Sequence, residues 1–281
     1  MAAHTSIRDI HVVVDLGGER RSVSFAADLA RSCEAHLTGV AFAFQPIIPV
    51  YTMAAPVPTD FIVSAQENAV AEAEAAGRKF EEIADGAGAL YASRIIDSMP
   101  GDGFGGAVRS LTLTDLTVVG QQDPDRLEPM REGLIEALLF QASVPVMLVP
   151  HTGTKTFQPD RVLVAWDRGP VAARAVRSAM PLIGMAKHVD VVTVAEHGKD
   201  GEIAGGGIGR YLARHDVEVE IHEIERHGHD IGHAIADFAT ERKSDWMVMG
   251  AYGHNRMREF FLGGATRSLL ASARIPIYLS H

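Results

Sequence analysis

An internal duplication constrains the fold of this 281-residue chain more than any other feature. Three apolar runs occur twice in the same order: IHVVVD, TDLTVVG and SVPVMLV, at 10–15, 114–120 and 143–149, return as VLVAWD, SDWMVMG and RIPIYLS, at 162–167, 244–250 and 274–280. A repeat of this kind indicates one structural unit written twice. We therefore predict two domains, at 1–150 and 151–281, with the polar segment 151–160 as the linker between them.

The first copy is longer than the second. Its first apolar run recurs in the second copy 152 residues later, and its second run recurs 130 residues later. The first copy therefore contains about 22 extra residues between these two runs. We place them mainly at 44–60, FQPIIPVYTMAAPVPTD, where four prolines argue against regular helix and central strand. We expect a surface loop packed on its domain; a lid or an interaction surface is the alternative.

Strand-like and helix-like segments alternate in both copies. The helix expected at 231–242, for example, has Ile231, Ala234, Ile235 and Phe238 on one face. Such alternation favours parallel strands with right-handed crossovers and helices on both faces of the sheet. The predicted fold is α/β, with two tandem open-sheet, Rossmann-like (adenine nucleotide alpha hydrolase-like) domains and parallel five-stranded sheets. In such sheets, ligands bind outside the carboxyl ends of the strands.

A glycine-rich stretch follows the strand expected at 246–249. Gly250 and Gly253 come first, and Gly263-Gly264-Ala265-Thr266 then leads into a helix-like run. Glycines let the backbone approach an anion, and the free N–H groups of a first helical turn stabilise its charge. The Thr266 hydroxyl adds a donor. The stretch therefore predicts a phosphate-binding loop, and a merely tight connection between strand and helix is the alternative.

The pattern G-x2-G-x9-G, followed by a small residue and then Thr, resembles the nucleotide-binding signature of the universal stress protein family. The resemblance extends over nearly the whole chain, as a tandem member, although Gly264 stands where ATP-binding members usually have Ser. It implies ATP, with or without Mg²⁺, in the C-terminal domain. It also implies a regulator of the stress response rather than a high-turnover enzyme.

The resemblance also implies further contacts on the same rim. Asp167 matches a nucleotide-contacting Asp, although a turn or N-cap role is common for Asp after a strand. Val194 or Val192 would pack on the adenine, and Met249 would offer backbone atoms to the base. Tyr252 would stack on the ligand or bond to it; the alternative is an aromatic residue of the loop with no contact to the ligand. The complete predicted binding set is Ala165, Trp166, Asp167, Val194, Met249, Gly250, Tyr252, Gly253, Gly263, Gly264, Ala265 and Thr266.

The first copy has lost this loop. Asp123 replaces the second glycine and Glu136 replaces the Thr, while Gly120 and Gly133 remain. Each carboxylate about 4 Å from a phosphate would weaken ATP binding through charge repulsion, by about 4 kcal/mol at an effective dielectric near 20. We predict that the first domain does not bind ATP in this mode, and that Asp15 is a turn or N-cap residue.

Composition narrows the functional classes. The net charge of −10 argues against nucleic-acid binding, and the single Cys33 excludes an internal disulfide. We see neither a signal peptide nor an apolar run of about 20 residues in the sequence. We therefore expect a cytoplasmic protein with no membrane partner. Three histidines lie close together in the sequence, at 227, 229 and 233. Solvated side chains are the more common outcome for such a pattern, so no metal site is predicted.

The expected partners are an adenine nucleotide and an unknown protein. Segments 144–149 and 275–279 should pair as an internal pseudo-dimer, as single-domain family members dimerise through their last strand, and a homodimer is a further option. No residue is predicted to be catalytic. The alternatives are a ligand carrier or protein-interaction module with a vestigial loop, and at most a slow ATPase.

Overall fold

The computed structural model describes residues 6–44, 59–98, 104–123, 131–195, 206–226, 230–251 and 273–281. The elements of the first half are β1 (Asp9–Val13), α1 (Arg21–Cys33), β2 (His36–Phe44), α2 (Thr59–Gly86), β3 (Leu90–Ser98), α3 (Gly105–Leu111), β4 (Leu116–Gly120), α4 (Arg131–Ala137), the π-helical turn η2 (Leu138–Ala142) and β5 (Val146–Val149). Those of the second are β6 (Arg161–Ala165), α5 (Pro170–Ile183), β7 (His188–Val194), α6 (Gly206–Ala213), β8 (Val219–Ile224), α7 (Ile231–Glu241), β9 (Trp246–Gly250) and β10 (Ile277–Ser280).

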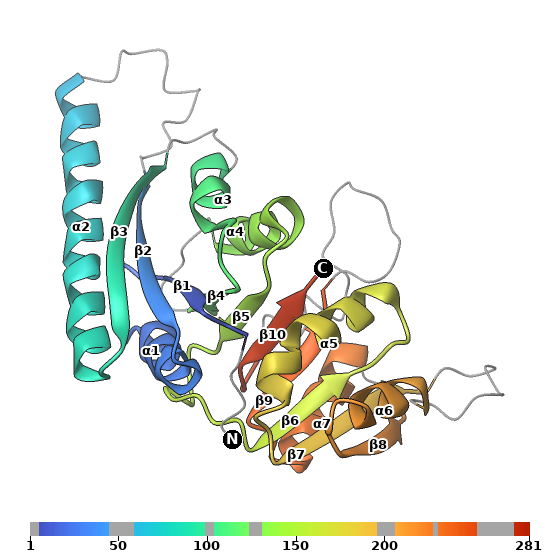
Figure 1. Ribbon diagram of the computed structural model, residues 1–281. Coiled ribbons are helices and arrows are strands. Elements are labelled where there is room, and N and C mark those ends of the chain that lie inside the picture. Colours follow the sequence, from blue (N-terminus) through green and yellow to red (C-terminus); the bar gives the residue numbers. More distant parts are fainter. Residues whose placement is uncertain are drawn as a thin grey trace, which may run out of the picture.

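The strands of the described residues form one sheet, in the order β3-β2-β1-β4-β5-β10-β9-β6-β7-β8 (Figure 1). Read outward from its centre, each half has the same strand order, and all pairs within a half are parallel. The α/β class with a mostly parallel sheet is therefore confirmed.

The two halves meet at an antiparallel pair of strands. Met147 of β5 lies opposite Tyr278 of β10, and both strands are fully buried. The predicted pairing of 144–149 with 275–279 is confirmed. It joins the two expected five-stranded sheets into one, so neither strand is left as an edge for a second copy of the chain.

Helices cover both faces of the sheet (Figure 1). One hydrophobic cluster includes Leu29 of α1, Phe80 of α2 and Ala175 of α5. The other includes Leu139 of η2 and Ile235 of α7. The central strands are buried on both sides, which explains why their sequences are nearly continuous apolar runs.

Local sequence accounts for the helix boundaries that position the second half. Pro170 occupies the first turn of α5, where its missing N–H costs nothing. The apolar face of this helix, including Val171 and Leu182, is buried. Helix α7 begins after Asp230, whose carboxylate accepts a hydrogen bond from the backbone N–H of His233 at 3.0 Å.

The extra length of the first half lies mostly in a helix. Helix α2 has 28 residues and α6 has eight. The prediction that 44–60 contains no regular structure is wrong at both ends, because Phe44 belongs to β2 and α2 begins at Thr59, directly after Pro58. Residues 45–58 lie outside the described part. No helix within the described ranges combines the length and the apolar character needed to span a bilayer.

The segment between the halves is more than a polar linker. Phe157 is only 5% exposed, and its ring lies 5.8 Å from that of Phe25 on α1 and 6.2 Å from that of Trp246 on β9. Its backbone N–H donates to the carboxylate of Asp28 at 2.9 Å. Phe157 therefore ties the first helix of one half to a central strand of the other.

Candidate functional site

The second half has a topological switch point between β6 and β9. The chain continues from β6 to β7 and β8, and then returns to β9 on the other side of β6. Ala165 pairs with Val192 of β7, and Val164 with Val248 of β9. The carboxyl ends of the three strands therefore lie side by side, where ligands bind in open α/β sheets.

Asp167 lies on this rim, two residues beyond the end of β6. We expected it within the strand run, but the structure places it in a turn, where its Oδ1 accepts the backbone N–H of Gly169 at 2.7 Å. A Cβ on Gly169 would come within 2.8 Å of that oxygen, so glycine lets the carboxylate fold back. The side chain is exposed, and none of the described residues forms an ion pair with it.

Gly250 is required by close packing. A Cβ at this position would lie 2.6 Å from the backbone nitrogen of Ala172 and 2.9 Å from the carbonyl carbon of Val171. The end of β9 thus lies against the first turn of α5, the helix that follows Asp167. This packing against α5 is sufficient by itself to explain a glycine at position 250.

The other described members of the predicted set lie on opposite faces of the sheet. Ala165 and Met249 belong to the cluster that includes η2 and α7, and the partly buried Val194 packs against it. Trp166 instead packs against the cluster that includes α5, and its backbone N–H donates to the carbonyl of Val192 at 2.9 Å. The structure therefore brings Ala165, Val194 and Met249 together and separates Trp166 from them.

Half of the predicted set lies outside the described residues. These members are Tyr252, Gly253, Gly263, Gly264, Ala265 and Thr266. Of the three histidines, His227 and His229 also lie outside. The Nδ1 atom of His233 contacts the carboxylate of Asp230, and the hydrogen bond from the backbone N–H of His233 holds the pKa of Asp230 below its ordinary value.

The first half fills the equivalent rim with its own side chains. The Oδ1 of Asp15 lies 2.6 Å from Nη2 of Arg131, and its Oδ2 accepts the Ser22 hydroxyl at 2.9 Å. Arg131 is 6% exposed, and it also donates to the carbonyl of Gly120 at 2.8 Å. Charge-assisted hydrogen bonds of this kind are strong, and removal of one partner would leave a buried charge unpaired.

Asp15 is therefore not the simple turn or N-cap residue that we expected. Arg20 occupies the N-cap of α1, without a side-chain cap, and Asp15 is committed to Arg131. The ring of Phe104 adds to this packing, because it lies 2.8 Å from where a Cβ on Gly133 would be. Sequence reasoning missed both Arg131 and Phe104. The only available signal was a basic residue eleven positions after Gly120, which matches no motif.

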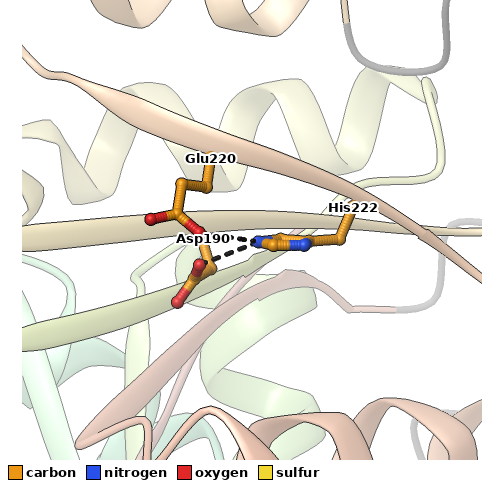
Figure 2. Close-up of side chains that lie close together, drawn as sticks. All are labelled: Asp190, Glu220 and His222. Atoms are coloured by element: carbon orange, nitrogen blue, oxygen red, sulfur yellow. Dashed lines mark hydrogen bonds and ion pairs between the residues drawn. The ribbon is translucent and has the colours of Figure 1, made fainter.

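A second charged group lies away from the rim, on β7 and β8 (Figure 2). Ligand-type atoms of Asp190, Glu220 and His222 lie within 4.8 Å of one another. However, the carboxylate of Asp190 is 1% exposed and already accepts hydrogen bonds from Arg242 at 2.7 Å, Arg161 at 2.9 Å and His222 at 2.9 Å. Two guanidinium groups would repel a cation here, so the group is an internal ion network.

The Asp190 network also fixes the charge of its central carboxyl. Burial of Asp190 raises its pKa, but the hydrogen bonds from Arg242, Arg161 and His222 outweigh that effect and hold the pKa below its ordinary value. The carboxylate therefore stays ionised within the fold. The sequence offered little sign of the network, because the partners of Asp190 lie 29 to 52 residues away.

The sheet order and the rim at the switch point define a Rossmann-like α/β protein. Comparison with known families is more specific: residues 159–281 match the model of the Universal stress protein family. The second half of the chain therefore belongs to the universal stress protein family, and the first half repeats its strand order.

Solved structures share the fold over nearly the whole chain. A universal stress protein from Archaeoglobus fulgidus DSM 4304 is 15% identical, with 96% of this chain and 97% of that one covered and a TM-score of 0.73. A protein of unknown function from Pseudomonas aeruginosa PAO1 is 15% identical, with 100% and 94% covered and a TM-score of 0.61. A putative universal stress protein from Pseudomonas aeruginosa UCBPP-PA14 is 17% identical, with 99% and 94% covered and a TM-score of 0.60. No curated protein sequence matches the chain.

Proposed function

We propose that residues 151–281 form an ATP-binding domain of the universal stress protein type, and that residues 1–150 form a domain of the same fold that does not bind ATP. The protein would act as a nucleotide-responsive regulator with little or no turnover. The cytoplasmic location expected from the sequence stays a prediction.

One asymmetry between the halves carries this proposal. Asp15 and Asp167 follow the equivalent strands β1 and β6. Asp15 is neutralised by the buried guanidinium of Arg131, whereas Asp167 is exposed and has no ion-pair partner among the described residues. An exposed carboxylate at a switch-point rim is suited to accept hydrogen bonds from ribose hydroxyls. The glycine-rich stretch that begins at Gly250 would supply the phosphate contacts.

Equilibrium dialysis with ATP, with and without Mg²⁺, tests the proposal. Asp167→Ala is expected to weaken binding about 10- to 100-fold, the worth of a hydrogen bond to a charged group. Gly253→Glu should abolish binding, because a carboxylate in the loop would repel phosphate. Asp15→Asn is the matched control and should leave the affinity unchanged.

Each outcome has a clear meaning. Loss of binding in Asp15→Asn together with normal binding in Asp167→Ala would place the nucleotide in the wrong half and refute the proposal. Failure of the wild-type protein to retain ATP would favour the alternative function, a ligand carrier or protein-interaction module with a vestigial loop. Release of ADP over many hours would identify a slow ATPase.

A further inference from the structure

A contact between the two halves lies where β9 leaves the sheet. Ala251, the first residue after β9, is fully buried. Its backbone N–H donates to the carbonyl of Ser280 at 2.9 Å. Its carbonyl lies 3.0 Å from Nδ1 of His281, and because a carbonyl can only accept, that nitrogen carries the hydrogen. Both polar backbone groups of Ala251 are thus held by the end of β10 and the residue that follows it.

The imidazole that holds Ala251 is itself packed against the other half of the chain. The ring of Phe140 lies 4.3 Å from the ring of His281, with 56° between their planes. Phe140 belongs to η2, in the first half, whereas His281 and Ala251 belong to the second. A continuous chain of contacts therefore runs from Phe140 through His281 to the carbonyl of Ala251.

The local backbone around Phe140 is unusual. It lies in a π-helical turn, and fewer than about one residue in a hundred adopts this conformation. Within this turn Leu138 and Leu139 are buried, while Phe140 is 45% exposed. Ser143 ends the turn in the left-handed region, with φ of 54°. Turns of this type frequently occur at functional sites.

We propose that Phe140 is a positioning residue for the nucleotide site of the second half, acting through His281 on the carbonyl of Ala251. Ala251 directly follows Gly250 at the carboxyl end of β9, so the contacts that hold Ala251 also hold this part of the rim in place. The first half, which has closed its own rim with Arg131, would thereby serve as a support for the rim of the second. This proposal rests on the proposed function.

Isothermal titration of ATP with Mg²⁺ into the full-length protein tests the nucleotide part. Phe140→Ala and His281→Ala are each expected to weaken binding roughly 3- to 10-fold, about the factor of one aromatic contact. The double variant should be no weaker than the weaker single variant, because both substitutions break the same chain of contacts. Phe140→Tyr keeps the aromatic ring and should restore wild-type affinity. Phe61→Ala, which removes a 62% exposed ring on α2, is the control.

Amide hydrogen exchange without nucleotide tests the structural link separately. The amide of Ala251 should exchange roughly tenfold faster in Phe140→Ala and at the wild-type rate in Phe140→Tyr and Phe61→Ala. Unchanged exchange and unchanged affinity in Phe140→Ala would overturn the proposal, as would additive losses in the double variant. If the wild-type protein fails to bind ATP, the proposed function falls and the nucleotide part falls with it. In that case the exchange rates alone show whether Phe140 holds Ala251.

Discussion

Phe157→Ala should destabilise the protein strongly, although residue 157 lies in the linker between the two halves. The side chain is buried between Phe25 and Trp246, so truncation removes contacts on both sides and leaves a cavity. Phe→Ala changes in protein cores cost about 3–5 kcal/mol. We expect about 3 kcal/mol, at the lower end, because a connecting segment can collapse into the cavity more easily than a strand.

Urea unfolding gives the measurement, followed by circular dichroism and by tryptophan fluorescence, which reports on the second half because Trp166 and Trp246 both lie there. Because Phe157 connects α1 with β9, the two signals should also separate in Phe157→Ala as the halves lose their coupling. Phe61→Ala is the matched control, and it should change the free energy of unfolding by less than about 0.5 kcal/mol. A loss below about 1 kcal/mol in Phe157→Ala, with coincident transitions, would refute the idea that this ring ties the halves together.

Two further predictions concern pH and glycine. Burial holds the pKa of His11 below its ordinary value, so the unfolded chain takes up a proton below about pH 6.5 that the folded state refuses, and stability falls as the pH falls. His11→Leu, which copies Leu163 at the equivalent strand position, should flatten this slope between pH 7.5 and 5; an equal slope in both proteins would contradict it. Gly250→Ala should lower the melting temperature, because its Cβ meets the backbone of Ala172 at 2.6 Å, whereas Gly207→Ala in α6 meets no atom within 4 Å and should stabilise by about 0.5–1 kcal/mol. A stable Gly250→Ala protein would show that the close packing can relax.

The duplication made the main features of the fold predictable. Repeated apolar runs specify repeated strands, and alternation with helices restricts how parallel strands can be connected. The apolar face of α7, which includes Ile235 and Phe238, was predicted correctly because helix periodicity is a local property of the sequence. The pairing of β5 with β10 was also predicted, but from the resemblance to single-domain family members rather than from the residues themselves.

The features that sequence reasoning missed depend on distant partners or on context. Arg131 has an interpretable role only once Asp15, far away in the sequence, is known to lie beside it. Phe157 stands in a polar segment, where a single aromatic residue has no periodic pattern to reveal its burial. The start of α2 was missed because the four prolines of segment 44–60 argue against regular structure. However, Pro58 lies directly before Thr59, and a proline at this position is compatible with a helix start.

The antiparallel pair of β5 and β10 has a consequence for how such a molecule can diverge. In an assembly of two identical chains, an arginine that closes one rim closes both, and binding is lost altogether. Here the two partners are written in one polypeptide, so Arg131 can be fixed in one copy while the other keeps its carboxylate exposed. Covalent fusion thus permits the two rims to differ, which the symmetry of two identical chains would forbid.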